Sequence, residues 1–202
     1  MEKRDGIDTK LKAMKFIEET ASADLSELLE TNVEVTCFHT YEYESVDHNP
    51  QFLTLEEIVD FKYPSKILHY SETPSLLKVE KEVKKAEVQR YRSSLLKSNC
   101  KVTSQPDWGD VYIHCKSNKI IDEESLLSYI VSFRDECHFH EEICEAIYKR
   151  LLDTYQPEEL LVYCYYVRRG GIDINPIRAS SIDLINVDVI DPSAPFIRTG
   201  RQ

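Results

Sequence analysis

The sequence predicts a mixed α+β fold. From residue 88 onward, two stretches alternate apolar and polar residues, two have apolar residues three and four positions apart, and two more alternate again. The expected order is therefore strand, strand, helix, helix, strand, strand. With 202 residues and 42% hydrophobic content, the chain can bury the core of one sizeable domain or two small ones.

Composition and charge exclude several classes of function. The net charge of −11 (25 basic minus 36 acidic residues) argues against a nucleic-acid backbone as partner. No apolar run approaches the roughly 18 residues of a membrane span, and Met1–Gly6 lacks the apolar segment of a signal peptide. Six cysteines at irregular spacings favour reduced thiols over a disulfide framework. We therefore expect a cytoplasmic protein with no membrane partner.

The first third of the chain predicts a helix followed by strands. Residues Asp8–Glu30 form an amphipathic pattern, and Thr31–Tyr43 alternates as a strand with one buried side. Val46–Pro50 is rich in turn residues, and Leu53–Tyr70 fits a strand or a short helix with loops. The apolar face of the helix consists of Leu11, Met14, Ile17, Ala21, Leu25 and Leu28.

The middle of the chain predicts a hairpin. Lys78–Arg92 is dense in charge and fits a helix at first, whereas Val88–Leu96 alternates as a strand that leads to Cys100. Asp110–His114 then alternates as an antiparallel strand, and Ser117-Asn118 predicts a turn.

Two helices are expected next. Asp122 is a good N-cap, followed by the apolar stripe Leu126, Leu127, Ile130 and Phe133. The second helix spans His140–Tyr155 and ends before Pro157.

The last two strands follow these helices. Leu160–Val167 is rich in Val and Tyr, as in a half-buried strand. Arg168–Gly171 turns the chain, and Asp173–Arg178 is expected to pair back.

Cys100 and Asp107 lie on one polar loop between the first two strands. A thiol and a carboxylate on one loop can serve as nucleophile and proton donor for the same substrate. Each residue also has an ordinary interpretation: most free cysteines are packing residues, and an aspartate after Pro106 commonly caps turn amides. Taken alone, these residues leave both interpretations open.

Several separated motifs resemble one enzyme family, the NADPH-dependent 7-cyano-7-deazaguanine reductases. These are the QueF-type nitrile reductases of the queuosine pathway. The motifs are Ser98-Asn99-Cys100, Gln105-Pro106-Asp107-Trp108-Gly109, Val131-Ser132-Phe133-Arg134, Phe139-His140-Glu141, Arg168-Arg169-Gly170-Gly171-Ile172-Asp173-Ile174-Asn175-Pro176 and Arg201-Gln202.

The resemblance implies a tunnelling fold (T-fold), an antiparallel sheet with two helices on one face in the order ββααββ. Residues 87–202 resemble the C-terminal catalytic module of the long, two-module form. Residues 1–86 resemble part of the N-terminal module more weakly. The Glu-Ser-Lys-Ser signature of that module, which contributes to NADPH contacts, does not occur in this sequence. We therefore expect a partial first module and incomplete cofactor binding.

The resemblance also implies a role for each motif residue. Cys100 would add to the nitrile carbon as a thioimide, helped by a lowered pKa for which Lys97 and Lys101 are candidate causes. Asp107 matches the proton donor. The other matches are His140 and Glu141 for substrate recognition, and Arg169 and Gly170 for NADPH. The implied reaction takes the nitrile to 7-aminomethyl-7-deazaguanine with two NADPH.

Taken alone, these last residues have ordinary interpretations as well. Glu141 could be a surface residue favoured by the helix dipole. Arg169 could be a solvated arginine in a hairpin turn.

Two alternatives belong to other classes. Cys137, His138, His140, Glu141 and Cys144 crowd into eight positions, and His140 and Cys144 one helical turn apart could hold zinc. This would make the protein a hydrolase like GTP cyclohydrolase I, which shares the fold. The third possibility is an inactive or partial subunit whose site is completed by association. Because lone T-fold sheets expose edges, a homo-oligomer is expected in either case.

Overall fold

The computed structural model describes residues 3–37, 51–59 and 69–185. The chain divides into two compact units, Met1–Val46 and Asp47–Gln202. The expected module boundary between residues 86 and 87 falls inside a continuous strand of the second unit. The Val46–Pro50 turn and the closing Arg201-Gln202 motif lie outside the described residues.

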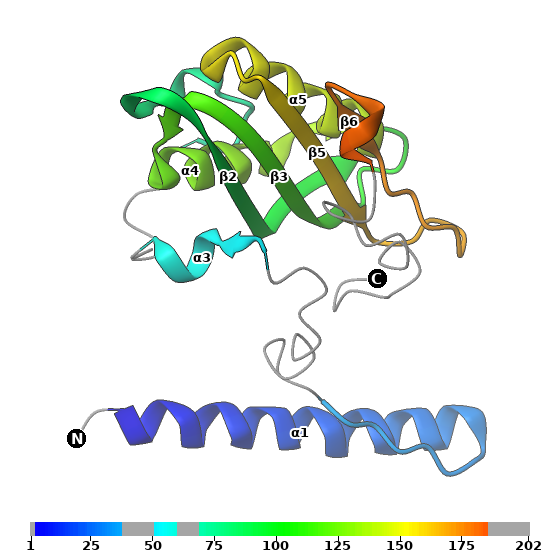
Figure 1. Cartoon of the computed structure of the whole chain (residues 1–202). Coiled ribbons are helices and arrows are strands. Elements are labelled where there is room, and N and C mark those ends of the chain that lie inside the picture. Colours follow the sequence, from blue (N-terminus) through cyan, green and yellow to red (C-terminus); the bar gives the residue numbers. More distant parts are fainter. Residues whose placement is uncertain (1–2, 38–50, 60–68, 186–202) are drawn as a thin grey trace. The chain divides into compact units, whose positions relative to one another are not determined.

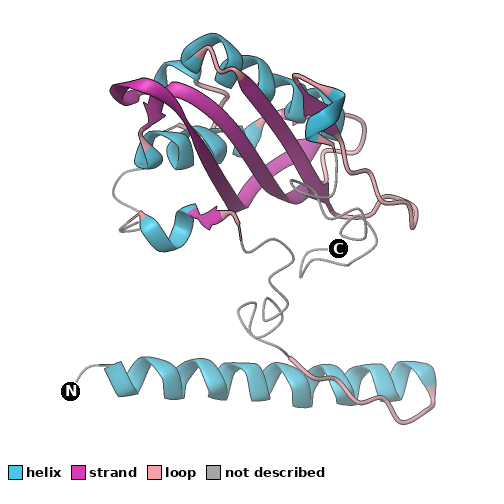
Figure 2. Ribbon diagram, in the orientation of Figure 1, coloured by secondary structure: helices cyan, strands magenta, loops and turns pink. Residues whose placement is uncertain are grey.

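The second unit is built on a single sheet in the order β1-β2-β3-β5-β6, with β4 also paired to β2. β2, β3, β5 and β6 pair antiparallel in succession, whereas β1 and β4 pair parallel to β2. Figures 1 and 2 show α4 (Glu123–Val131) and α5 (His140–Tyr155) together on one face of this sheet. The mixed α+β class and the order ββααββ are confirmed. The strands are β1 Leu53–Thr54, β2 Val79–Cys100, β3 Pro106–Ile121, β4 Cys137–His138, β5 Glu159–Tyr166 and β6 Ile177–Ala179.

Local side-chain and backbone conformations account for the start of α4 and the end of α5. Asp122 caps α4 as expected, because its Oδ1 accepts a 2.8 Å hydrogen bond from the Ser125 amide. Gln156, in the left-handed region (φ 49°), ends α5 directly before Pro157. The helical elements of this unit are α3 Leu55–Ile58, η1 Pro74–Leu76, α4 Glu123–Val131, η2 Ser132–Asp135, α5 His140–Tyr155 and η3 Ile182–Leu184. None of the described helices in either unit is long and apolar enough to cross a membrane.

The sheet has a different core on each face. On the helix side, residues of β2, β3 and β5 pack against α4 and α5, and most of these side chains are fully buried. On the opposite face a smaller aromatic cluster forms, in which the Tyr112 and Tyr163 rings stack 4.7 Å apart. The site described below lies on the helix side, so the packing of α5 decides its geometry.

The central hairpin is longer than the sequence suggested. The charged segment Lys78–Arg92, expected to begin as a helix, belongs almost entirely to β2. Its charges are tolerated because most of its side chains up to Val88 are exposed. The turn expected at Ser117-Asn118 is also wrong, since both residues lie inside β3. The β2–β3 ladder has a register shift between Glu82 and Glu87, and the Ser117 hydroxyl donates to the Tyr155 carbonyl (2.8 Å).

The last strand also begins later than expected. Pairing with β5 starts at Ile177 rather than at Asp173, and residues between the turn and β6 are not part of the sheet. The expected strand or helix in Leu53–Tyr70 resolves into β1 and α3, with residues 60–68 outside the described part of the chain.

The first unit consists of α1 Lys3–Leu29 and an extended segment that returns along it. The amides of Val33, Val35 and Cys37 donate to Ser26, Ser22 and Glu18 respectively, at 2.9, 3.0 and 2.8 Å. The alternation expected for Thr31–Tyr43 is present in residues 31–37, but these residues form no strand, because helix side chains accept their amide protons. Residues 38–43 lie outside the described part of the chain.

The apolar face expected for this helix is not buried. Leu11, Ile17 and Leu28 are exposed, because the segment covers the Ser22 side of the helix instead.

Candidate active site

Cys100 lies at the end of the β2–β3 hairpin. Its amide donates to the Gln105 carbonyl and its carbonyl accepts from the Ser104 amide, both at 2.8 Å. Ser104 takes a left-handed conformation (φ 55°) that closes the loop. Ser98 pairs directly with Asp107 across the hairpin. Since side chains two residues apart point to the same side of a strand, Ser98, Cys100 and Asp107 share the helix-facing side.

The thiol of Cys100 is half-buried and activated by its own loop. Hydrogen bonds from the Thr103 hydroxyl and from the amides of Thr103 and Val102 lower the pKa of Cys100, and the charge of Arg169 lowers it further. Such a thiol carries more of the nucleophilic thiolate at neutral pH. Burial instead raises the pKa of Cys115 to about 12 and raises that of Cys164, so these thiols are packing residues, as expected.

The two lysines considered as causes of this activation are engaged elsewhere. Lys101 Nζ forms a 2.9 Å ion pair with Glu142. Lys97 Nζ donates to the Asn99 side chain and to the Arg134 carbonyl. Neither of these two candidates is among the main causes of the lowered pKa of Cys100, which are the loop hydrogen bonds and the charge of Arg169.

Asp107 is the centre of the site's polar contacts. Its side chain is only 1% exposed, and both oxygens are engaged: Oδ1 with the Arg169 guanidinium and Oδ2 with His140 Nε2, 3.3 Å away. A carboxylate buried to this degree requires such partners, because its desolvation is otherwise costly. The chain therefore brings Asp107, His140 and Arg169 together from three separate motifs.

His140 is fixed by an aromatic platform. It is the first residue of α5, and its ring stacks on Tyr166 of β5 with centroids 4.1 Å apart and planes 7° from parallel. Gly109, which faces Tyr166 across the β3–β5 ladder, gives that ring room. A Cβ at this position would stand 3.0 Å from Tyr166 Cδ1 and 3.2 Å from the Tyr165 carbonyl oxygen.

Sequence reasoning assigned no role to Tyr166 or to Gly109. The available signal was a glycine inside a strand, which often marks a close approach.

Glu141, the expected substrate residue, is not part of this cluster. It lies exposed in the first turn of α5, directly after His140. An exposed carboxylate at the rim of the site could accept hydrogen bonds from an incoming ligand, which a carboxylate already paired inside the protein could not do as readily.

Arg169 and Gly170 form a tight turn after β5. Arg169 and Ile172 exchange backbone hydrogen bonds of 3.1 and 3.0 Å, and Gly170 and Gly171 occupy the left-handed region (φ 58° and 79°). Nothing lies within 4 Å of a Cβ placed on either glycine, so this side of the turn is open. The Arg169 side chain reaches back to Gln105 and Asp107.

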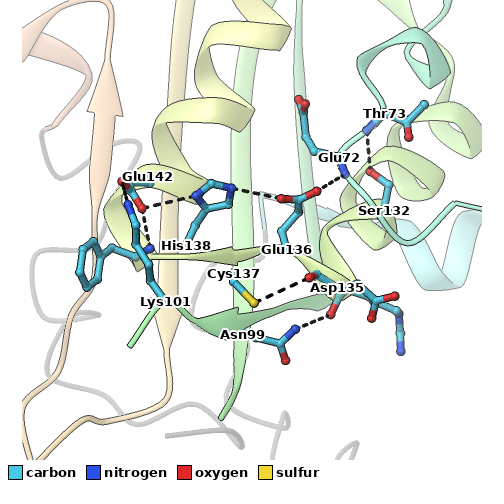
Figure 3. A network of polar contacts seen from close by, with 12 residues as sticks. Glu72, Thr73, Asn99, Lys101, Ser132, Asp135, Glu136, Cys137, His138 and Glu142 are labelled. Carbon is cyan, nitrogen blue, oxygen red and sulfur yellow. Dashed lines mark hydrogen bonds and ion pairs between the residues drawn. The ribbon is translucent and has the colours of Figure 1, made fainter. Parts of the chain in front are cut away.

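A second polar network holds the end of the hairpin against α5 (Figure 3). His138 lies between two carboxylates, with Nε2 3.1 Å from Glu136 and Nδ1 3.4 Å from Glu142. Glu142 also accepts from the Phe139 amide, and this bond, the Lys101 bond and His138 lower its pKa to about 2. Lys101, the residue that follows Cys100, is therefore tied to the helix that carries His140.

The zinc ligands considered from spacing are directed apart. Cys144 is buried and its sulfur donates to the Val162 and Pro176 carbonyls, whereas His140 faces Asp107. His138 belongs to the Glu136–Glu142 network, and Cys137 is exposed. Over residues 3–37, 51–59 and 69–185, no three His, Cys, Asp or Glu side chains form a cluster able to hold a metal ion.

Comparisons with known proteins point to one family. Residues 106–183 match the family model described as QueF-like protein. A protein named NADPH-dependent 7-cyano-7-deazaguanine reductase from Acinetobacter baumannii (strain SDF) is 40% identical over 164 residues, which cover 81% of this chain and 57% of the relative. Another of the same name, from Colwellia psychrerythraea (strain 34H / ATCC BAA-681), is 37% identical over 201 residues, covering 96% of this chain and 64% of the relative.

These matches confirm the resemblance inferred from the motifs, and the chain spans about 60% of the length of these relatives. Among solved structures, the archaeosine synthase QueF-Like in its apo form aligns with a TM-score of 0.43 at 15% identity. That alignment covers 49% of this chain and 96% of the other.

Proposed function

We propose that this chain, similar over most of its length to NADPH-dependent 7-cyano-7-deazaguanine reductases, carries the site at which such an enzyme captures and reduces a nitrile. The observation that carries the proposal is an activated thiol, Cys100, on the same face of a hairpin as a buried carboxylate, Asp107. A nitrile carbon is electrophilic, and its conversion to a covalent thioimide requires a thiolate and a proton source.

In the first step, the Cys100 thiolate adds to the nitrile carbon and a carbon–sulfur bond forms. One π bond of the nitrile breaks, and the nitrogen takes up a proton, so the thiol and the nitrile together become a thioimide. Asp107 and His140, joined at 3.3 Å, hold and pass that proton. Positioned proton transfer of this kind typically contributes 10²–10⁴-fold to the rate.

His140 is well suited to proton transfer because the position of its ring is fixed. Its ring is held flat on Tyr166 and its Nε2 faces Asp107. A proton on Nε2 is thus directed at the carboxylate, and an exchange between the two groups needs no rearrangement of the ring.

The substrate's pyrimidine edge presents a ring N–H and an amino group. We assign its recognition to Glu141, which is exposed in the first turn of α5 beside His140. A carboxylate that accepts both donors forms two charge-assisted hydrogen bonds, which are stronger than neutral ones.

NADPH is the cofactor of this proposal, and the turn at residues 169–170 fits its anionic part. The turn is open on its glycine side, and a guanidinium lies next to it. Arg169 and Gly170 would hold the cofactor there, the arginine by its charge and the glycine by close approach of its backbone. When bound, NADPH supplies the hydride, and two equivalents account for the four electrons of nitrile reduction.

The proposal also includes the cellular compartment and the assembly of the protein. All six cysteines are unpaired, which supports a reducing compartment and hence the cytoplasm. Among the described residues, β2 pairs with β3 along its length but with β1 only at Tyr91 and Arg92, so one edge of its N-terminal half has no strand beside it. This edge supports assembly into a homo-oligomer, because open sheet edges are normally paired or covered. Sedimentation of the purified chain tests the assembly.

Capture of the nitrile tests the central step. The purified chain, incubated with 7-cyano-7-deazaguanine without NADPH, is expected to gain the mass of one nitrile molecule. Cys100→Ala should abolish the gain, whereas Cys115→Ala, which changes a buried packing thiol, should retain it. An adduct that survives in Cys100→Ala would remove this residue from the mechanism.

A further inference from the structure

Arg169 lies between the two reacting groups of the site. Its Nη1 donates to the Gln105 side chain, and its Nη2 donates to the Gln105 carbonyl (3.3 Å) and to Asp107 Oδ1. The same Gln105 carbonyl accepts the Cys100 amide at 2.8 Å. The Arg169 guanidinium is thus hydrogen-bonded both to the Asp107 carboxylate and to Gln105, whose carbonyl also accepts the Cys100 amide.

The backbone of this turn is arranged so that the side chain reaches inward. Reciprocal hydrogen bonds to Ile172 fix Arg169, and the two glycines reverse the chain directly after it. The side chain is 26% exposed, whereas the Asp107 carboxylate that it contacts is 1% exposed. Most of the guanidinium's contacts are therefore made inside the site rather than at its surface.

Among the described residues, the buried carboxylate would keep only His140 as a side-chain partner if Arg169 were removed. A buried charge that loses its counter-charge either reorients or takes up a proton. Either change would disturb the delivery of a proton to the nitrile nitrogen. The thiol would lose a nearby positive charge as well, because Arg169 helps to lower the pKa of Cys100.

We propose that Arg169 is a positioning residue for thiol addition, which holds Asp107 and the Cys100 loop in place before any dinucleotide binds. This inference rests on the proposed function and deepens it, since the resemblance implies only a cofactor contact for the same residue. The two roles differ in timing: a residue that only binds cofactor has no effect on a step that takes place without it.

Thiol addition without NADPH therefore tests the assignment. The rate of adduct formation with 7-cyano-7-deazaguanine is followed by intact mass for the wild-type chain, Arg169→Gln, Arg169→Lys and Arg168→Gln. Arg168 is the matched control, because it carries the same charge in the same turn but pairs with Asp173 at 2.7 and 2.9 Å. Circular dichroism checks that every variant is folded.

Arg169→Gln is expected to slow adduct formation on the order of 10²-fold, the scale of losing a positioning contact. Arg169→Lys keeps the charge without the planar fork and should recover part of the loss, and Arg168→Gln should match the wild type. Adduct formation in Arg169→Gln at the wild-type rate would overturn the assignment, as would an equal loss in Arg168→Gln. If Arg169→Gln does not fold, the Arg169→Lys rate decides by the same criterion.

A second measurement separates this inference from the proposed function. The pH profile of Cys100 alkylation by iodoacetamide, resolved by peptide mass, needs no nitrile substrate. In Arg169→Gln the profile should move to higher pH, whereas in Arg168→Gln it should not. No adduct in the wild type would refute the proposed function, and an unmoved alkylation profile would refute the role of Arg169.

Discussion

Two clusters in this unit contain the same three groups, an arginine, a histidine and a carboxylate, but in different order. At the end of the hairpin, the carboxylate of Asp107 is central, with Arg169 on one oxygen and His140 on the other. Across the middle of the sheet, His114 is central: its Nδ1 accepts from Arg90 Nε at 3.1 Å, and its Nε2 lies 3.3 Å from Glu159.

Which of the three groups is central determines the protonation states that each cluster can adopt. In the mid-sheet cluster, an arginine N–H is always a donor, so His114 Nδ1 must be an acceptor and the proton lies on Nε2, directed at Glu159. The ring is therefore neutral, and a second proton on it would oppose Arg90. In the site cluster, both neighbours of Asp107 can donate to it, so the carboxylate can exchange a proton with His140 without losing Arg169.

The groups that surround His114 and His140 differ in the same way. Burial lowers the pKa of His114, with the charge of Arg90 adding to the effect against Glu159. His140 instead stacks on Tyr166, faces Asp107 and is followed in the chain by the exposed Glu141. A histidine in the centre suits a fixed structural contact, whereas a carboxylate in the centre suits proton exchange.

Replacing the central carboxylate should have the largest effect. Asp107→Asn keeps the shape of the side chain but loses the charge and the capacity to exchange a proton with His140. Adduct formation is expected to slow by about 10²–10⁴-fold, followed by intact mass as for the wild type. A variant that forms the adduct at the wild-type rate would assign the proton to another group and end the functional contrast between the clusters.

Glu141 tests how far the site extends beyond the cluster. Glu141→Gln turns half of the acceptor into a donor, and should weaken binding of the deazaguanine by about 1.5–3 kcal/mol, as for a lost charged hydrogen bond. Calorimetry on the Cys100→Ala background measures binding without covalent capture. Glu145→Gln, on the same helix and paired with Arg178, is the matched control. Equal affinity in wild type and Glu141→Gln would place base recognition elsewhere.

The elements around the site could be predicted where the information is local. The Asp122 cap, the apolar spacing of α5 and the Val–Tyr pattern of β5 depend on neighbours within a few residues, and these elements are confirmed. The charged half of β2 could not be recognised as a strand, because its pairing with β3, rather than its own pattern, determines its structure.

The residues of the site could be identified from the sequence, but the contacts between their side chains could not. Arg169 is 62 positions from Asp107, and nothing in either motif indicates that the two side chains meet. The resemblance supplied the residues of the site as separate roles. Lys101, chosen for its closeness in sequence to Cys100, bonds instead with Glu142, because α5 brings a carboxylate into reach.

Gly109 tests whether the platform under His140 matters. In Gly109→Ala the new Cβ would meet the Tyr166 ring at 3.0 Å and the Tyr165 carbonyl oxygen at 3.2 Å, and the backbone atom cannot move aside cheaply. The substitution should cost about 1–3 kcal/mol of stability and slow adduct formation through a displaced His140. Urea denaturation and intact mass measure the two effects. Stability and rate both equal to the wild type would mean that the Tyr166 platform adapts freely.

The smallest expected effect concerns the mid-sheet cluster and the pH dependence of stability. Because the pKa of His114 is lowered in the folded state from its ordinary 6.5, the unfolded chain binds a proton more readily than the folded chain. The stability that depends on neutral His114 is therefore complete above about pH 6.5 and is lost as the pH falls below that value. Glu159, whose pKa is lowered mainly by Lys116, stays ionised in both states above about pH 5.5 and adds little to the slope there.

Urea midpoints measured from pH 7.5 to 5.5 test this assignment. The wild type should lose stability over that range, and His114→Gln should lose less, because a neutral amide can still accept from Arg90 and donate to Glu159 without titrating. His138→Gln is the control for an exposed histidine between two carboxylates. It should not remove the loss on the acid side that His114 causes. If His114→Gln and the wild type show the same slope, the mid-sheet histidine is not the acid-sensitive group, and the contrast between the two clusters would rest on the site alone.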